Sequence, residues 1–181
     1  SAYRDSFFKN NKRLGISSVR AGNVIGGGDW SVDRIVPDCI RSLMERKSVL
    51  IRNLNAVRPW QHVLEPLYGY LILAAKLFKK PNAYSGAYNF GPQRQAMKTV
   101  GELAKKVMTY WGKGAIKSRR NSGSFHESSM LHLNCDKAHQ ALRWQQQWDF
   151  DKTVYKTVEW YKQVLAGKPA ISITKRQIHD Y

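Results

Sequence analysis

Apolar and polar positions divide the chain into short elements of two kinds. Apolar residues three or four positions apart indicate amphipathic helices, and short apolar runs bounded by glycine or proline indicate strands. The predicted helices cover residues 1–12, 33–43, 67–78, 98–111, 136–142, 151–165 and 172–181. The predicted strands cover residues 16–19, 49–51, 61–63 and 87–90.

The order of these elements indicates an α/β fold, because helices and strands alternate. The helix at 1–12 has no capping signal ahead of it, and the strand at 16–19 follows it directly, so the two make half of a βαβ unit. A parallel sheet needs neighbouring strands and covering helices on both faces, and this chain supplies few strands. We therefore interpret it as part of a larger α/β protein whose first half is missing.

Polar residues and prolines refine the boundaries of the elements. We expect Asp33 to cap the second helix, Pro66 to lie in the first turn of the third, and Thr174 to cap the last. Residues 53–59 and 113–127 are predicted to be loops.

Net charge is the strongest signal in the composition. The 181 residues include 30 Lys or Arg and 13 Asp or Glu, which gives a formal net charge of +17. Such a chain attracts polyanions, namely nucleic acid, an anionic membrane surface or phosphorylated small molecules. The cations are dispersed along the chain rather than gathered in one run. This favours a solubility role or a small anionic ligand over the alternative of a basic nucleic-acid-binding module.

The two cysteines, Cys39 and Cys135, lie far apart and have no metal-ligand spacing. Their number excludes a disulfide framework, no metal site is predicted, and a reducing, cytoplasmic setting is expected. The longest apolar stretch, at 71–75, is too short to span a bilayer, so we expect no membrane partner.

The stretch from Val19 to Trp30 combines a strand with a glycine-rich loop. After the strand at 16–19, which we expect to be buried, come three consecutive glycines and an aromatic residue. In open α/β sheets ligands bind at the carboxyl ends of strands, and glycine lets the backbone approach a phosphate or a sugar closely. The pattern by itself also fits an ordinary loop.

Arginines lie near three other loop or helix ends. Arg34, Arg52 and Arg58 could converge on a diphosphate, because a guanidinium group presents a planar set of donors to phosphate oxygens. Taken singly, each also fits a solvated surface charge. Beside Arg58, Trp60 either stacks on a base or packs in the core, and we expect His62 to be a structural, hydrogen-bonded histidine.

Further along, His126 and Glu127 end a polar loop, where the carboxylate either binds sugar hydroxyls or makes a local contact. Five aromatic residues at helical positions are predicted to be core rather than ligand-stacking groups: Trp111, Trp144, Trp148, Trp160 and Tyr161. The sequence has no Gly-x-Gly-x-x-Gly turn, no tyrosine with lysine four residues later, and no Gly-x-Ser-x-Gly motif. No catalytic residue is therefore predicted.

Four segments resemble one enzyme family. They are RAGNVIGGGDW at 20–30, DRIVPD at 33–38, RPWQHVLEP at 58–66 and NFGP at 89–92. Together they are similar to the C-terminal half of the CDP-D-glucose 4,6-dehydratases, a group within the extended short-chain dehydrogenase/reductase family of nucleotide-sugar enzymes. The resemblance covers nearly the whole chain.

The resemblance implies a fold and a reaction. The fold is the C-terminal portion of an extended Rossmann-type enzyme, with late sheet elements at 1–30 and 60–90 and a mainly helical substrate-binding region at 31–59 and 91–181. In this family NAD takes a hydride from C4 of CDP-glucose, water leaves from C6, and the hydride returns to C6. The product is CDP-4-keto-6-deoxy-D-glucose.

The resemblance also implies what the chain lacks. The family's tyrosine–lysine pair and its NAD phosphate loop lie upstream of the matched segments. We therefore expect a chain that is inactive alone, whose partners are CDP-glucose and the missing N-terminal half of the same enzyme, and that forms a homo-oligomer.

Site residues follow from the same resemblance. Ala21, Asn23 and Val24 match positions at the NAD cofactor. The positions that match substrate-binding residues are Asn23, Arg34, Ile35, Ile51, Arg52, Arg58, His126 and Glu127. Leu54 stands where proline is expected, which could alter the loop on the base side. A related enzyme whose substrate carries dTDP, GDP or UDP in place of CDP stays an alternative.

Overall fold

The computed structural model describes residues 6–8, 11, 13–92, 97–118 and 133–181. Its strands are β1 (Ser17–Ala21), β2 (Asn23–Ile25), β3 (Val49–Ile51), β4 (Val57–Arg58), β5 (Trp60–His62), β6 (Gly86–Phe90), β7 (Lys98–Thr99) and β8 (Ile116–Ser118). Its helices are α2 (Ile35–Met44), α3 (Leu64–Lys79), α4 (Pro81–Tyr84), α5 (Val100–Trp111), α6 (Phe150–Leu165), α7 (Ala170–Asp180) and the π-helix η2 (Ala138–Leu142). The predicted α/β class is confirmed. Within the described ranges, no helix has the length and apolar character needed to cross a membrane.

The described strands pair two by two. β1 pairs with β6, β2 with β5 and β3 with β8 in parallel, and β4 pairs with β7 antiparallel. Residues 17–25 thus form one extended segment that changes its partner at Gly22, from β6 to β5. The Gly22 amide donates to the Phe90 carbonyl at 3.0 Å, and a Cβ at this position would lie 2.8 Å from the Pro59 carbonyl oxygen. A glycine therefore lets the two parallel pairs meet closely.

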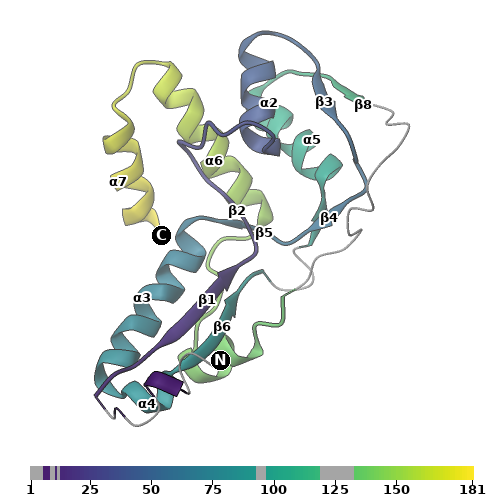
Figure 1. Ribbon diagram of the computed structural model, residues 1–181. Coiled ribbons are helices and arrows are strands. Elements are labelled where there is room, and N and C mark those ends of the chain that lie inside the picture. The colour runs from purple at the N-terminus through teal and green to yellow at the C-terminus, as the bar shows by residue number, and fades with distance from the viewer. Residues whose placement is uncertain (1–5, 9–10, 12, 93–96, 119–132) are drawn as a thin grey trace.

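Two hydrophobic cores hold the chain together. Figure 1 shows α2, α5 and α6 in the upper part of the molecule, and α3 and β6 in the lower part. The larger core gathers α2, α5 and α6, and includes Ile40, Leu103, Val107, Val154 and Val158. The smaller core lies between α3, β6 and η2, and includes Leu73, Phe90, Leu142 and Trp144. Trp144, Trp148, Trp160 and Tyr161 are buried, as predicted, and Trp111 is partly buried at the edge of the larger core.

The strand predicted at 16–19 forms as β1, but the expectation that it is buried is wrong. Ser18, Val19 and Arg20 are exposed. Among the described residues β1 pairs with β6 alone, so its other edge has no neighbouring strand. Burial of a parallel strand depends on what packs around it rather than on its own sequence.

Several short elements were not predicted. The expected loops at 53–59 and 113–127 contain β4 and β8, and α4 begins at Pro81, just after the end of α3. Strands of two or three residues are too short to show a period in the sequence. Pro66 does lie in the first turn of α3, as predicted, whereas most of the helix predicted at 1–12 lies outside the described residues.

Two predicted helix caps are wrong. The N-cap of α2 is Arg34 rather than Asp33, and the Asp33 carboxylate accepts a hydrogen bond from Arg52 at 2.9 Å. Thr174 lies inside α7, where its hydroxyl accepts a hydrogen bond from the Trp160 indole at 2.9 Å. In both cases a tertiary partner takes the side-chain oxygen that would otherwise cap a helix.

The glycine-rich loop between β2 and α2 packs against helix α6. At Gly27 a Cβ would lie 2.0 Å from Cγ of Trp160. Gly28 has a φ of 88°, in the left-handed region that favours glycine. Trp30 meets Tyr161 edge to face, with ring centroids 5.1 Å apart. The glycines and Trp30 therefore shape the path of the chain from the sheet into α2.

We predict that Gly27→Ala lowers the free energy of unfolding by roughly 3 kcal/mol, because the added methyl group overlaps the Trp160 ring and must displace it. The measurement is equilibrium unfolding in urea. The matched control is Gly91→Ala, where the nearest atom to the added Cβ is Cys135 Sγ at 3.5 Å, an ordinary contact. The control is expected to stay within about 1 kcal/mol of the parent. Equal effects of the two substitutions would contradict the close contact.

Candidate functional site

One cleft of about 1100 Å³ opens where β2, the start of α2 and the end of β3 come together. Residues 21–26, 33–38 and 50–53 line it, and Arg58 and Trp60 contribute from β4 and β5. The cleft begins at the point where the extended segment at 17–25 changes its partner strand. In open α/β folds a ligand crevice lies at the carboxyl ends of strands, where neighbouring connections diverge.

Eight of the residues predicted as site residues line this cleft. They are Ala21, Asn23, Val24, Arg34, Ile35, Ile51, Arg52 and Arg58. His126 and Glu127, the other two, lie outside the described residues. The structure thus gathers residues from positions 21 to 58, although their roles as ligand contacts stay predictions.

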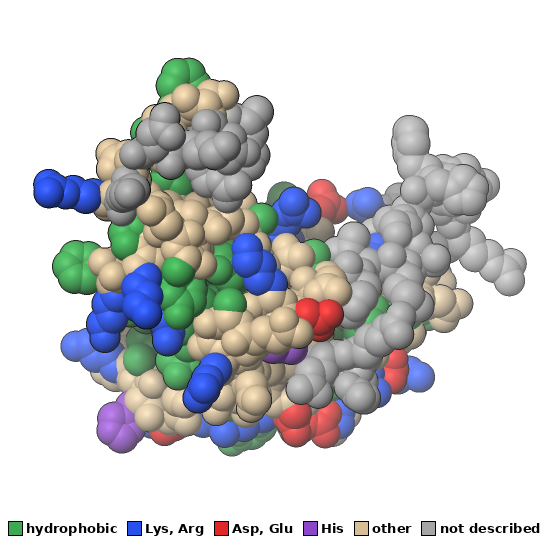
Figure 2. Space-filling view, turned by 90° about the horizontal axis from the view of Figure 1, so that it is seen from below, with side chains coloured by type: hydrophobic (Ala, Val, Ile, Leu, Met, Phe, Trp, Pro, Cys, Tyr) green, Lys and Arg blue, Asp and Glu red, His purple; other side chains and the backbone are tan. Residues whose placement is uncertain are grey.

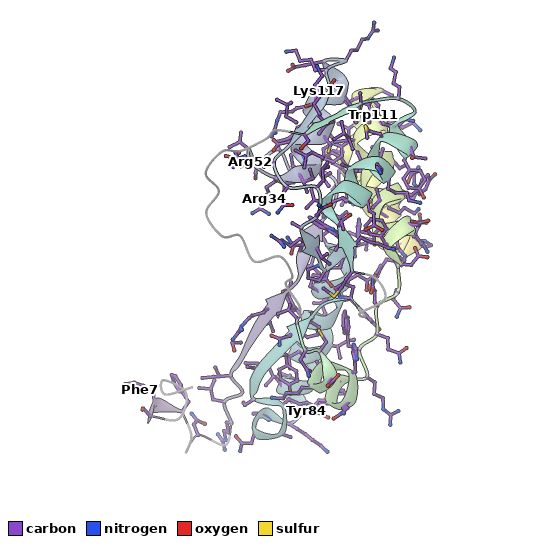
Figure 3. All side chains as sticks on the ribbon, turned by 90° about the vertical axis from the view of Figure 1, so that its right-hand side faces the viewer. Phe7, Arg34, Arg52, Tyr84, Trp111 and Lys117 are labelled. Atoms are coloured by element: carbon purple, nitrogen blue, oxygen red, sulfur yellow. The ribbon has the colours of Figure 1, made fainter. Side chains whose placement is uncertain are left out.

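Arg34 and Arg52 each face a carboxylate at the mouth of the cleft. Arg52 Nη2 lies 2.9 Å from Asp33 Oδ1, and Arg34 Nε lies 3.9 Å from Asp29 Oδ2. Arg34 and Arg52 project from the same side of the molecule, next to each other (Figure 3). The two arginine and two aspartate side chains are all at least one-third exposed. The guanidinium groups of Arg34 and Arg52 are therefore accessible to a ligand.

Arg58 has a more enclosed place. It is half-buried in β4, and its Nη1 donates to the backbone carbonyl of Val57 at 2.9 Å. This contact folds the guanidinium group back toward its own strand while it still lines the cleft. The arginine is therefore held in place before any ligand binds.

Sequence reasoning missed several polar residues of the cleft, including Asp29, Asp33, Lys47 and Ser48. Asp33 has a φ of 59°, a left-handed conformation that aspartate tolerates better than most residues and that no spacing rule signals. Asp29 lies in the segment 20–30, which resembles the family, but its ion pair with Arg34 depends on how the loop turns. Burial acts to raise the pKa of Asp29, but the Ser31 amide and Arg34 outweigh it and hold this pKa below its usual range.

Trp60 and His62 are both buried, although Trp60 also lines the cleft. Trp60 is buried and its indole donates to the Lys98 carbonyl at 3.0 Å, so it packs in the core. His62 is buried too, and its Nδ1 accepts a hydrogen bond from the Leu64 amide at 3.3 Å, as expected of a structural histidine. Its Nε2 has no hydrogen-bond partner among the described residues. Burial, and then the charge of Lys156, lower the pKa of His62 to about 4.

Glu65 is a buried polar residue that the sequence did not single out. Its carboxylate accepts hydrogen bonds from the amides of Gln147 and Trp148, the latter at 2.8 Å, and from the Tyr181 hydroxyl at 2.8 Å. Burial raises its pKa despite these donors. Glu65 lies away from the cleft lining and joins α3 to the C-terminal end of the chain. We assign it a structural role.

The described part of the site offers groups that can bind an anion. In the part of the chain that the structure describes, no group of three or more His, Cys, Asp or Glu side chains could hold a metal ion. The cleft lining consists of arginines, a lysine, carboxylates, amides, serines and apolar side chains. It is suited to hold an anionic ligand in a fixed orientation.

Two solved structures have a fold similar to that of this chain. An epimerase, Mth375 from Methanothermobacter thermautotrophicus, matches with a TM-score of 0.75 and 19% identity over 96% of this chain and 49% of its own. The dTDP-glucose 4,6-dehydratase of Bacillus anthracis, solved with NAD, matches with a TM-score of 0.71 and 19% identity over 90% of this chain and 48% of its own. No family model matches the chain. The fold is that of the C-terminal portion of an extended Rossmann-type nucleotide-sugar enzyme.

Among characterised proteins the chain is similar to one in particular. It is 42% identical to the CDP-glucose 4,6-dehydratase of Salmonella typhimurium, over an alignment of 185 positions that covers 100% of this chain. The resemblance to the CDP-glucose 4,6-dehydratases is thereby confirmed. The chain spans 52% of the length of that relative.

We predict a pH-dependent stability that His62 causes. The unfolded chain binds a proton at His62 near pH 6.5, whereas the folded chain does so only near pH 4. The free energy of unfolding therefore falls as the pH drops from 6.5 toward 4, by up to about 1.4 kcal/mol per pH unit from this residue. Urea unfolding at pH 7 and pH 5 measures this loss, which His62→Gln is expected to diminish.

Comparing how the free energy of unfolding changes with pH in the parent and in His62→Gln separates the contribution of His62 from that of Glu65. The raised pKa of Glu65 acts in the opposite direction, since it makes the folded chain the tighter proton binder above pH 4.5, and it is present in both proteins. His179→Gln, at an exposed position of α7, serves as the control and should keep the parent's slope. A parent and a His62→Gln variant with the same slope would show that His62 does not titrate as described.

Proposed function

We propose that this chain carries the nucleotide-sugar-binding part of an NAD-dependent CDP-glucose 4,6-dehydratase, a hydro-lyase that forms CDP-4-keto-6-deoxy-D-glucose. One observation carries the proposal. Eight residues that were predicted from the sequence as site residues all line the same cleft. The identity of 42% to the Salmonella enzyme, along the whole chain, supports the same activity class and substrate.

The charge of the cleft suits a nucleotide diphosphate. Arg34, Arg52 and Arg58 reach it from three separate segments. The first turn of α2 also lines it, and unpaired backbone N–H groups at a helix start favour anions. The ion pairs with Asp29 and Asp33 are exposed and contribute roughly 0–1 kcal/mol each. Because a guanidinium group has five N–H donors, each arginine can bind a diphosphate while it stays beside its carboxylate.

The remaining lining residues suit the rest of the ligand. Ile35 and Ile51 line the same cleft and give it apolar surface against which a base or a sugar ring can pack. Asn23 stands at the junction of β1 and β2 with a side-chain amide that both donates and accepts hydrogen bonds. We assign Asn23 and Arg58 to the sugar diphosphate, and Ile51 and Arg52 to the base and its adjoining phosphate.

The NAD cofactor fits the end of the cleft at Ala21, Asn23 and Val24. Two of these side chains are small and apolar, and the third offers an amide, which suits the flat nicotinamide ring and its polar substituent. The chemistry that NAD would supply at this place is reversible hydride transfer with the sugar. The part of this chain is to hold the nucleotide sugar beside that ring in one orientation.

We predict that CDP binds the purified chain more tightly than dTDP, UDP or GDP, with a dissociation constant in the micromolar range. Arg58→Gln should weaken CDP binding by about tenfold, the usual effect of losing a charge-assisted hydrogen bond to phosphate. Isothermal titration calorimetry with the four nucleoside diphosphates measures both.

The control for that titration is Arg176→Gln, which removes the same charge from α7, where Arg176 pairs with Glu159 away from the cleft. Its affinity for CDP should match that of the parent. Tighter binding of dTDP, UDP or GDP would reassign the nucleotide. A chain that binds none of the four would overturn the proposed site.

A second part of the proposal concerns the rest of the enzyme. β1 has an edge without a neighbouring strand in the described residues, and such an edge invites another strand. On α3, the side chains of Leu67, Leu71 and Phe78 are 45%, 70% and 90% exposed and recur at helical spacing. Figure 2, seen from the end near α4, shows apolar side chains at the surface among dispersed lysines and arginines. We propose that the N-terminal half of the enzyme covers both surfaces.

We predict that the purified chain, supplied with NAD and CDP-glucose, shows no turnover, because we assign the proton-transfer groups and the NAD phosphate loop to the other half. Co-expression with the part of the Salmonella enzyme outside the matched region should restore turnover. Leu71→Asp should abolish the restoration, because it places a charge in the proposed contact. The assay follows formation of the 4-keto sugar by its absorbance in alkali.

The matched control is Ile178→Asp on α7, a similarly exposed apolar residue outside the proposed contact. It should leave the restored turnover intact. Turnover by the chain alone would contradict the division of labour between the halves, and equal loss in both variants would contradict the assignment of the surface.

The setting of the enzyme is also a proposal. Cys39 and Cys135 are both buried and unpaired, as in proteins of a reducing compartment. We accordingly place the enzyme in the cytoplasm and expect the complete protein to be a homo-oligomer.

A further inference from the structure

Helix α6 contacts the loop that carries Asp29, although no α6 residue lines the cleft itself. Two consecutive residues make the contact. Trp160 lies against Gly27, and Tyr161 lies against Trp30 with ring centroids 5.1 Å apart. The sequence indicated only that both aromatic residues are core, so their orientation toward the loop is new information from the structure.

Tyr161 makes a polar contact as well as an apolar one. The residue is fully buried, and its hydroxyl donates a hydrogen bond to the backbone carbonyl of Asp29 at 2.5 Å. A buried tyrosine hydroxyl of this kind fixes its partner because neither group can turn to water instead. Burial first, and then the nearby Asp29 charge, raise the pKa of Tyr161 to about 12, so the hydroxyl keeps its proton and remains a donor.

The Asp29 carboxylate in turn faces the cleft. Its Oδ1 accepts a hydrogen bond from the Ser31 amide at 2.9 Å, and its Oδ2 lies 3.9 Å from Arg34 Nε. Arg41 holds the following part of the loop by donating to the carbonyls of Trp30 and Ser31. The Asp29 carbonyl, by contrast, accepts its hydrogen bond from Tyr161. The tyrosine hydroxyl therefore sets where the backbone of Asp29 lies, and with it the carboxylate.

We propose that Tyr161 is a positioning residue for the nucleotide-sugar cleft: its hydroxyl fixes the backbone of Asp29, and the Asp29 carboxylate then orients the guanidinium group of Arg34 toward the bound anion. The proposal rests on the proposed function in one respect, that the anion is the diphosphate of CDP. The positioning itself is a property of the unliganded chain. It is tested both with and without nucleotide.

The experiment uses four proteins besides the parent. Tyr161→Phe removes the hydroxyl and keeps the ring that packs on Trp30. Tyr155→Phe makes the same change on the same helix, where the ring faces Tyr110 rather than the loop. Arg34→Gln removes the group through which Tyr161 is said to act, and the fourth protein combines Arg34→Gln with Tyr161→Phe.

The first readout is the affinity for CDP by calorimetry. Tyr161→Phe should weaken binding about fivefold, the change that one lost hydrogen bond of ordinary strength gives. In the Arg34→Gln background the same substitution should change the affinity by less than about 1.5-fold, because the group it acts through is gone. Tyr155→Phe should leave the affinity unchanged.

The second readout needs no nucleotide. Carbon-13 NMR of the carboxyl groups follows the titration of Asp29, whose pKa the Ser31 amide and Arg34 hold low. In Tyr161→Phe this pKa should rise toward its ordinary value, because the carboxylate leaves its partners for part of the time. In Tyr155→Phe it should stay where it is in the parent.

The outcomes separate the two claims. A raised Asp29 pKa in Tyr161→Phe, in a chain that fails to bind CDP, would support the positioning and reject the nucleotide. An unchanged Asp29 pKa would overturn the positioning. So would an equal loss of CDP affinity in the parent and in the Arg34→Gln background, since that pattern means that Tyr161 supports the fold in general.

Discussion

The packing of the glycine-rich loop on helix α6 is the contact on which the cleft depends. The chain leaves the sheet at β2 and must turn at once into α2, and it passes so close to Trp160 that a side chain at Gly27 has no room. Tyr161 and Asp29, which are 132 positions apart in sequence, then meet through one hydrogen bond. Because α6 is anchored in the larger core through Val154 and Val158, that core sets the position of one wall of the cleft.

The charges of the cleft are balanced before any ligand arrives. Arg34 and Arg52 each face an aspartate at the cleft mouth, and Arg58 is held by the carbonyl of Val57. Such pairs contribute little to stability when exposed, but they keep flexible arginine side chains in a limited set of conformations. A diphosphate then meets guanidinium groups that are already oriented, and fewer side chains have to be ordered when it binds.

The sequence predicted the long helices and four of the eight described strands, because their apolar spacing is decided within the element. The predictions from the sequence were wrong where a residue distant in the chain determines the contact of a side chain. Asp33 and Thr174 were expected to cap helices, but Arg52 and Trp160 take their side-chain oxygens. β1 was expected to be buried, but burial depends on neighbours that the described chain does not supply.

The candidate site likewise contains residues that the sequence predicts and residues that only the structure reveals. The arginines and the residues at the end of β1 follow from motifs, whereas Asp29 and Tyr161 do not. Their roles arise from how the loop turns and how α6 approaches it, and no local spacing in the sequence signals either. The carboxylates that orient the arginines are therefore found from the structure, and the arginines themselves from the sequence.

The central claim is that this cleft holds the nucleotide diphosphate, and a crystal structure of the chain soaked with CDP tests it most directly. The account predicts the diphosphate between the start of α2 and β2, within hydrogen-bond distance of Arg58 and Asn23, with Arg34 turned toward it. CDP bound elsewhere on the chain, out of reach of Arg34, Arg52 and Arg58, would contradict it.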